Sequence, residues 1–251
     1  MKNKNLYNYI LGIADNSLIL GQRLGELCGH GPNLETDIAL TNISLDLLGQ
    51  TRNYYQYIAR LHDKEKTEDD IAFLRSEREY INVLLVEQPN THFGFVMARQ
   101  FFYDVFHLML MEKLQESKDE TLSAIAKKAI KEVSYHFRFS SDWVKRLGDG
   151  TKESHYKMQE AVDELWRFTD EFFHLTEADK AMIEAGIGVD VSNFKEAYYI
   201  KVSEILTEAT LSIPESKYFQ KGGKQGIHSE HMGFILAELQ YMQRTYPNMK
   251  W

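Results

Sequence analysis

The sequence has 251 residues, of which 43% are hydrophobic and 26% charged, with a net charge of −8. This composition predicts one ordinary globular domain that buries about 70–75% of the surface of its unfolded chain. The acidic excess argues against nucleic acid or an anionic membrane as the main partner. The single Cys28 cannot form an intrachain disulfide, and neither a signal peptide after residues 1–5 nor a membrane-spanning run occurs. We therefore expect a cytoplasmic protein.

Apolar residues recur with helical spacing almost everywhere, and only four prolines interrupt them. The predicted fold class is therefore all-α. Four long helices are expected at about residues 6–28, 33–61, 93–116 and 121–147. The long connection between the second and third is typical of a ferritin-like four-helix bundle with a crossover. Additional helices are expected at about residues 71–88, 153–173, 177–185, 193–210 and 229–245, the third of these opened by a capping box at Thr176 and Asp179. All of them are assigned to a single domain of residues 1–251.

Two of the long helices carry acidic side chains within apolar stripes. Asp104 follows Met97 and Phe101 at spacings of three and four, and Glu132 lies between Ala129 and Phe139 on a similar stripe. A buried, unpaired carboxylate costs several kcal/mol. Each therefore requires a metal ion, a cationic partner or a dense set of hydrogen bonds.

A di-iron centre in such a bundle is the first possibility, because it uses one carboxylate from each of two helices and a Glu-x-x-His pair from each of the other two. The corresponding positions here are Asn16, Asp46, Gly49, Asp104, Glu132 and Tyr135. Three of the six ligand types are missing, because an amide, a glycine and a tyrosine replace a carboxylate and two histidines. The sequence thus favours a degenerate site that binds no metal.

Two histidines next to these positions leave an alternative open. His107 lies one turn after Asp104, and His136 lies one residue beyond the expected ligand position in its helix. A register shifted by one residue would bring them into a metal site. The favoured interpretation is a buried polar network in which His107 pairs with Asp104 and His136 with Glu132.

A glycine-rich loop precedes the last helix and consists of Lys221, Gly222, Gly223 and Lys224. Its backbone N–H groups and the following helix dipole are able to hold a phosphate, but a lone Gly-Gly-Lys is a weak signal, and a solvated or partner-binding loop is the favoured interpretation. His228, just beyond it, is expected to form hydrogen bonds, because no third ligand completes a metal site with His231. No nucleotide-binding or serine-hydrolase motif is present.

Several motifs resemble one known family, the C subunits of the bacterial phenylacetyl-CoA oxygenase. They occur in the same order along nearly the whole chain and include KEVSYH at residues 131–136 and GIHSEHMG at residues 226–233. The other matching segments are residues 18–26, 28–32, 37–52, 85–90, 146–151 and 236–240.

The resemblance implies a ferritin-like, non-catalytic subunit of the multicomponent ring 1,2-phenylacetyl-CoA epoxidase. In that family the di-iron centre and the substrate site belong to an A-type subunit, while a reductase with FAD and an iron–sulfur cluster supplies electrons. It therefore implies no cofactor, no metal and no catalytic residue in this chain, with the A-type subunit and further oxygenase components as partners. A homodimer of the free chain, an independent di-iron oxygenase with a shifted ligand register, and a CoA-binding accessory subunit remain open.

Overall fold

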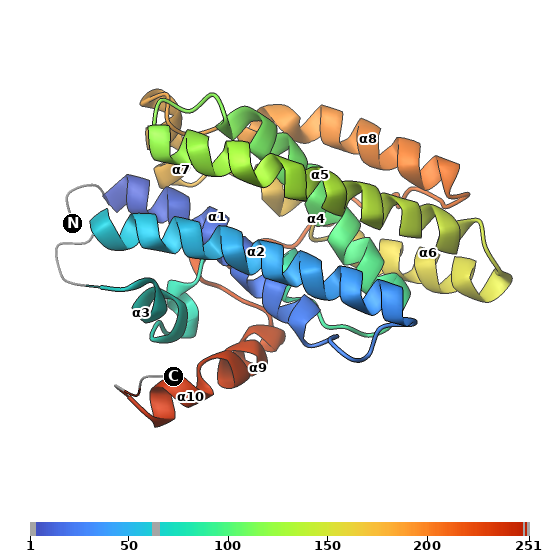
Figure 1. The fold of residues 1–251 in the computed structure, drawn as a ribbon. Coiled ribbons are helices and arrows are strands. Elements are labelled where there is room, and N and C mark those ends of the chain that lie inside the picture. Colours follow the sequence, from blue (N-terminus) through green and yellow to red (C-terminus); the bar gives the residue numbers. More distant parts are fainter. Residues whose placement is uncertain (1–3, 62–65, 248, 250–251) are drawn as a thin grey trace. The chain divides into compact units, whose positions relative to one another are not determined.

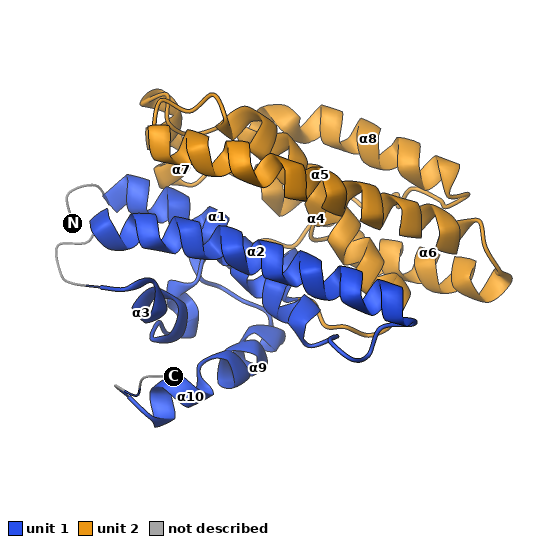
Figure 2. Cartoon of the chain, viewed as in Figure 1, with its two compact units in different colours: residues 1–87, 222–251 blue, residues 88–221 orange. Residues whose placement is uncertain are grey.

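The computed structural model describes residues 4–61, 66–247 and 249, and its regular elements over these ranges are all helices (Figure 1). The predicted all-α fold class is confirmed. The chain forms two compact units: unit 1 comprises Met1–Glu87 and Gly222–Trp251, and unit 2 comprises Gln88–Lys221 (Figure 2). The ends of the predicted domain, residues 1–3 and 250–251, lie outside the described residues.

Unit 1 is built on two long helices that pack against each other along their length. They are α1 (Lys4–Gly25) and α2 (Leu34–Leu61), which are joined by a short turn. The Asn33 side chain caps α2 by accepting a hydrogen bond from the Thr36 N–H at 2.9 Å. The remaining elements are α3 (Glu68–Phe73), η1 (Glu77–Glu79), η2 (Leu84–Glu87), η5 (Gly223–Gln225), α9 (Glu230–Leu239) and α10 (Tyr241–Thr245).

Unit 2 contains the second pair of long helices, α4 (Phe93–Leu114) and α5 (Glu120–Gly148). Aromatic residues form much of its core: Phe106 stacks on Phe172 with ring centroids 4.5 Å apart, and the buried Tyr198 donates a hydrogen bond to the Phe102 carbonyl. The predicted capping box of Thr176 and Asp179 is confirmed. The other elements are α6 (Lys152–Trp166), η3 (Asp170–Phe173), α7 (Glu177–Glu184), η4 (Val191–Phe194) and α8 (Lys195–Glu208).

The predicted helix at residues 71–88 is wrong, because only α3 and two short 3₁₀ helices occur there. Side chains of α1 accept the hydrogen bonds of backbone N–H groups that would otherwise be bonded within a helix. The Ile81 N–H donates to the Asp15 carboxylate at 2.9 Å, and the Val83 N–H donates to Asn16 at 2.8 Å. Backbone groups that already have partners have no need of helical hydrogen bonds.

The other predicted additional helices are shorter than expected or interrupted. Residues 153–173 divide into α6 and η3, and residues 229–245 divide into α9 and α10 at Gln240. Among the described helices, none combines the length and the hydropathy that crossing a membrane requires.

Candidate functional site

Asp104 lies at the centre of a polar cluster between α4 and α5. Its carboxylate accepts hydrogen bonds from Gln100 Nε2 at 2.7 Å and from Ser140 Oγ at 2.8 Å, and its side chain is inaccessible to solvent. His107 and His136 are likewise fully buried. The predicted burial of Asp104, His107 and His136 is therefore observed. Gln100 and Ser140, which hold the carboxylate, were not identified from the sequence, although both lie four residues from a cluster member on the same helix.

The predicted hydrogen bond between His107 and Asp104 is absent. Among the described residues, neither ring nitrogen of His107 has a hydrogen-bond partner, and the ring instead packs 5.0 Å from that of Tyr103. Gln100 and Ser140 instead supply one hydrogen bond to each carboxylate oxygen of Asp104, so the carboxylate has partners without His107. A pair between Glu132 and His136 stays a prediction.

Burial controls the protonation of this cluster. It raises the pKa of Asp104 to about 7, although His136 and the hydrogen bonds from Ser140 and Gln100 act in the opposite direction. Burial lowers the pKa of His107 to about 3, and the nearby His136 contributes to that shift. Near neutral pH the cluster therefore holds a neutral imidazole at His107 and a carboxyl group at Asp104 that binds a proton readily.

The inward face of α5 is one residue out of phase with the expected ligand register. Tyr135 is 39% exposed and Glu132 is half-buried, whereas Val133 and His136 are fully buried. The buried positions of α5 with the spacing of a Glu-x-x-His pair are therefore Val133 and His136. A hydrocarbon side chain occupies the position that would require a carboxylate.

The same shift occurs in α2. Asp46 is half-buried and Gly49 is exposed, whereas Leu47 and Gln50, also three residues apart, are buried. The shifted register thus offers a leucine and an amide in place of Glu and His. Asn16 in α1 is buried, and its side-chain oxygen is already bound to the Val83 N–H.

These donors do not fit a di-iron centre. The described parts of the chain contain no group of three or more His, Cys, Asp or Glu side chains that could hold a metal ion. The buried positions at Glu-x-x-His spacing are Val133 and His136 in unit 2 and Leu47 and Gln50 in unit 1, so they include one histidine and no carboxylate. Neutral and apolar groups of this kind cannot balance the charge of two iron ions.

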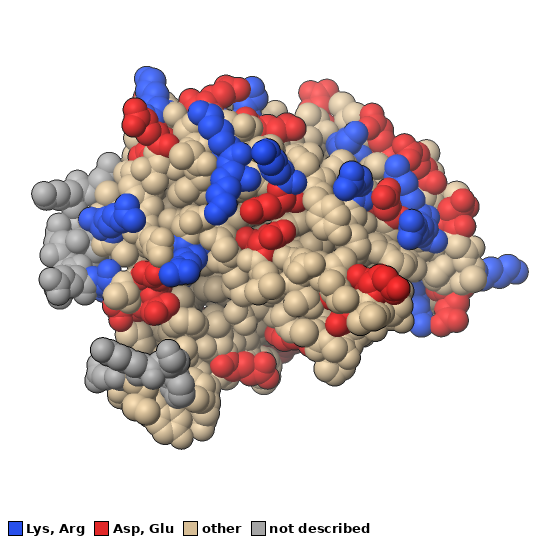
Figure 3. All heavy atoms as spheres, in the orientation of Figure 1, with Lys and Arg blue, Asp and Glu red and all other residues tan. Residues whose placement is uncertain are grey.

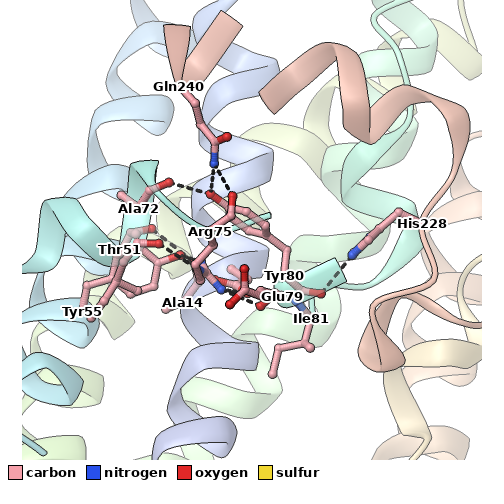
Figure 4. A network of polar contacts seen from close by, with 12 residues as sticks. Ala14, Thr51, Tyr55, Ala72, Arg75, Glu79, Tyr80, Ile81, His228 and Gln240 are labelled. Atoms are coloured by element: carbon pink, nitrogen blue, oxygen red, sulfur yellow. Dashed lines mark hydrogen bonds and ion pairs between the residues drawn. The ribbon is translucent and has the colours of Figure 1, made fainter. Parts of the chain in front are cut away.

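A second buried cluster lies in unit 1 and was not predicted from the sequence (Figure 4). Arg75 binds the Asp15 carboxylate through both terminal nitrogens, at 2.9 and 2.6 Å, and donates to the Tyr55 hydroxyl at 2.8 Å. Tyr55 donates to Asp15 at 2.5 Å. The guanidinium carbon also lies 3.9 Å from the centre of the Tyr80 ring. Asp15 and Arg75 are 60 residues apart, so no local pattern indicates the pair.

The C-terminal segment extends this cluster. Gln240 Nε2 donates to the Tyr80 hydroxyl at 2.8 Å and to the Arg75 carbonyl at 2.9 Å (Figure 4). Burial disfavours charge on Arg75, but the Asp15 carboxylate together with Tyr55 and Tyr80 outweighs burial and raises the pKa of the guanidinium. Burial raises the pKa of Tyr80 to about 12, and it also raises the pKa of Tyr55 well above its usual value. The cluster is thus a neutralised ion pair with protonated tyrosines, which is suited to structure rather than to proton transfer.

The structure argues against phosphate binding at residues 221–224, which was the less favoured interpretation of this loop. Lys221 is exposed and Lys224 half-buried, whereas Gly222 and Gly223 are buried. At the start of α9, the Ser229 N–H and hydroxyl both donate to Glu87 Oε2, at 2.9 and 2.6 Å. A carboxylate of this chain therefore occupies the helix start at which a phosphate would have to bind. His228 forms hydrogen bonds as predicted, with Nδ1 2.5 Å from Glu87 Oε1.

Comparison with known proteins gives matches over the full length. A family model described as phenylacetic acid catabolic protein matches residues 1–251. The C subunit of the 1,2-phenylacetyl-CoA epoxidase of Escherichia coli (strain K12) is 51% identical over 243 residues, which cover 97% of this chain and 98% of that protein. The similarity therefore includes both compact units.

Proposed function

This chain belongs to the phenylacetic acid catabolic protein family, and we propose that it is the C-type subunit of a 1,2-phenylacetyl-CoA epoxidase. The observation that carries this proposal is the 51% identity, over nearly the whole of both chains, to a protein named as that subunit. The role would be in the aerobic breakdown of phenylacetate.

We propose further that the chain is not itself catalytic. The buried faces of α2 and α5 support this, because Leu47, Gln50 and Val133 occupy positions where an iron ligand would be required. Asp104 is engaged by Gln100 and Ser140, and its raised pKa favours the protonated form, which is a poor ligand. The di-iron centre is assigned to a related A-type subunit, and the FAD and iron–sulfur cluster to a reductase.

The proposed role of the chain is to support the A-type subunit structurally. Unit 1 and unit 2 each have a packed core of their own, including the almost completely buried Arg75 cluster and the aromatic cluster around Phe172. Stable packing of this kind suits a protein whose purpose is to hold a partner in place. The alternative of CoA binding at residues 221–224 has less support, since Glu87 occupies the adjoining helix start.

Two measurements test the proposal. The chain expressed alone in iron-supplemented cells, without a metal-binding tag, is expected to contain less than about 0.1 iron or manganese per chain, whereas a di-iron enzyme would contain about two. Co-expressed with the A-type subunit, the chain is expected to co-purify as a complex that epoxidises phenylacetyl-CoA when the reductase is added. Stoichiometric iron in the free chain, or failure to associate with the A-type subunit, contradicts the proposal.

A further inference from the structure

The outer face of α5 carries an unusual charge for this protein. The helix contains six lysines and arginines against three acidic residues, in a chain with a net charge of −8. Blue side chains gather in Figure 3 over the part of the surface where Figure 1 places α5. We call its exposed cations the α5 cation stripe: Lys127, Lys128, Lys131, Arg138 and Arg146.

The α5 cation stripe follows one side of the helix. At 100° per residue, Lys127, Lys131 and Arg138 lie within about 40° of one another around the helix axis. From Lys127 to Arg146 the stripe extends about 28 Å at a rise of about 1.5 Å per residue. The stripe is therefore several times longer than a single phosphate group.

These cations lack carboxylate partners in the part of the chain that the structure describes. Lys145, their neighbour on α5, is by contrast bound to Glu208 of α8. Asp142 is four residues from both Arg138 and Arg146, yet forms no ion pair with either among the described residues. The stripe therefore retains its positive charge on a surface that is acidic elsewhere.

Aromatic rings hold two of the guanidinium groups in place. Arg138 lies 5.7 Å from the centre of the Tyr135 ring, and Arg146 lies 5.6 Å from that of Trp143. Trp143 is itself fixed by an edge-to-face contact with Phe93 at 4.9 Å. Arg, Tyr and Trp are the residues that most often dominate binding at protein interfaces, and restricting them beforehand lowers the entropic cost of association.

We propose that the α5 cation stripe is a docking surface for an acidic face of another subunit of the epoxidase. This inference rests on the proposed function. Charge complementarity identifies the partner, since unpaired cations spread over about 28 Å match an extended acidic protein surface better than a compact anion. The net charge of −8 repels an acidic partner elsewhere, so the stripe also orients the approach.

The test is binding of the full chain to each of the other purified subunits, in about 50, 150 and 300 mM NaCl, a range over which screening of exposed charges changes strongly. The stripe variant is K131E/R138E, and the matched control is K152E/K217E, which changes the net charge equally at two exposed lysines outside α5. Circular dichroism and thermal unfolding verify that both variants fold. For at least one subunit, the stripe variant is expected to bind at least about tenfold more weakly at the lowest salt concentration, with a smaller dependence on salt. The control should remain within about twofold of the wild type.

Different outcomes separate this inference from the proposed function. If the wild type binds its partners and the stripe variant binds each of them as tightly as the control does, the inference is overturned while the proposed function stands. If the wild type binds no other subunit, both fail. A wild type that binds phosphatidylglycerol vesicles through the stripe, with its subunit affinities unchanged in the variant, also overturns the inference.

Discussion

Arg75 binds Asp15 through two nitrogens, at 2.9 and 2.6 Å, although the two residues are 60 positions apart and both side chains are almost completely buried. The pair connects the segment after α3 to the middle of α1. The Ile81 N–H adds a further hydrogen bond to the same carboxylate. Residues 75–81 therefore owe their irregular conformation to a charge held within α1.

Replacing Arg75 by Met is expected to lower the free energy of unfolding by about 3–5 kcal/mol, because it leaves Asp15 buried without a counter-charge. Urea denaturation at neutral pH measures the loss. The control is Arg52→Ala. The Arg52 side chain is 71% exposed in its ion pair with Glu68, so its removal should lower the free energy of unfolding by less than about 1 kcal/mol. Equal losses for the two variants would contradict a structural role for the buried pair.

The two buried titratable groups of α4 should give opposite dependences of stability on pH. The pKa of Asp104 is raised from 3.8 to about 7, so its stabilisation is complete below about pH 4 and is lost as the pH rises to about 7. The pKa of His107 is lowered from 6.5 to about 3, so its stabilisation is complete above about pH 6.5 and is lost as the pH falls towards 3. These shifts correspond to about 4–5 kcal/mol each.

We therefore expect the free energy of unfolding of the wild type to vary little between about pH 4 and 6.5, where the two effects oppose each other. Asp104→Asn should become more stable as the pH rises through this range, and His107→Leu should become less stable. Urea titrations at closely spaced pH values give the free energy of unfolding of each protein. Subtracting the values of the double variant Asp104→Asn/His107→Leu isolates the pH dependence that each group contributes. Parallel curves for the wild type and the two single variants would show that neither group titrates as its burial requires.

The sequence predicted the helices better than it predicted their rotation. The periodicity located α1, α2, α4 and α5 to within a few residues, because long apolar stripes leave little choice of length. It did not identify which side of α5 faces inward. Tyr135 and His136 are adjacent, and a stripe about 100° wide tolerates a rotation of one residue. Only the observed burial distinguishes the exposed Tyr135 from the buried His136.

Contacts distant in the sequence were beyond prediction. Asp104 was recognised as buried from its apolar flanks, but nothing local indicates that Asp15 pairs with Arg75 or that Glu87 caps the start of α9. One of these contacts explains the wrong prediction of a helix at residues 71–88, because Asp15 replaces helical hydrogen bonds near residue 81. The other argues against a phosphate at residues 221–224, because Glu87 occupies the start of α9.

Replacing His107 by Leu in mildly alkaline buffer is expected to leave stability unchanged or to raise it by about 1–2 kcal/mol. Both ring nitrogens are buried without a hydrogen-bond partner among the described residues, and Leu removes their desolvation penalty. Met111→Ala, a buried truncation one turn further along α4, is the comparison and should cost about 2–5 kcal/mol. A loss of that size for His107→Leu would mean that the imidazole has a partner essential to the fold.

The contact between His228 and Glu87 should make docking of the C-terminal segment dependent on pH. Burial opposes charge on His228, but the hydrogen bond to Glu87, the Glu87 charge and the contact with the Tyr80 carbonyl together outweigh burial and raise the pKa above 6.5. The resulting stabilisation is complete below about pH 6.5 and is lost as the pH rises through the folded-state pKa. Hydrogen exchange of the α9 amides, corrected for the intrinsic rate, should therefore become several-fold less protected on the alkaline side of that pKa.

His228→Gln should abolish this pH dependence, because glutamine retains a hydrogen-bond donor but cannot acquire a charge. His155→Gln is the matched control in unit 2, where His155 contacts the Gly148 carbonyl, and it should leave the α9 profile as in the wild type. An α9 profile that keeps its pH dependence in His228→Gln would assign the effect to another group, such as Glu77, whose charge also raises the pKa of His228.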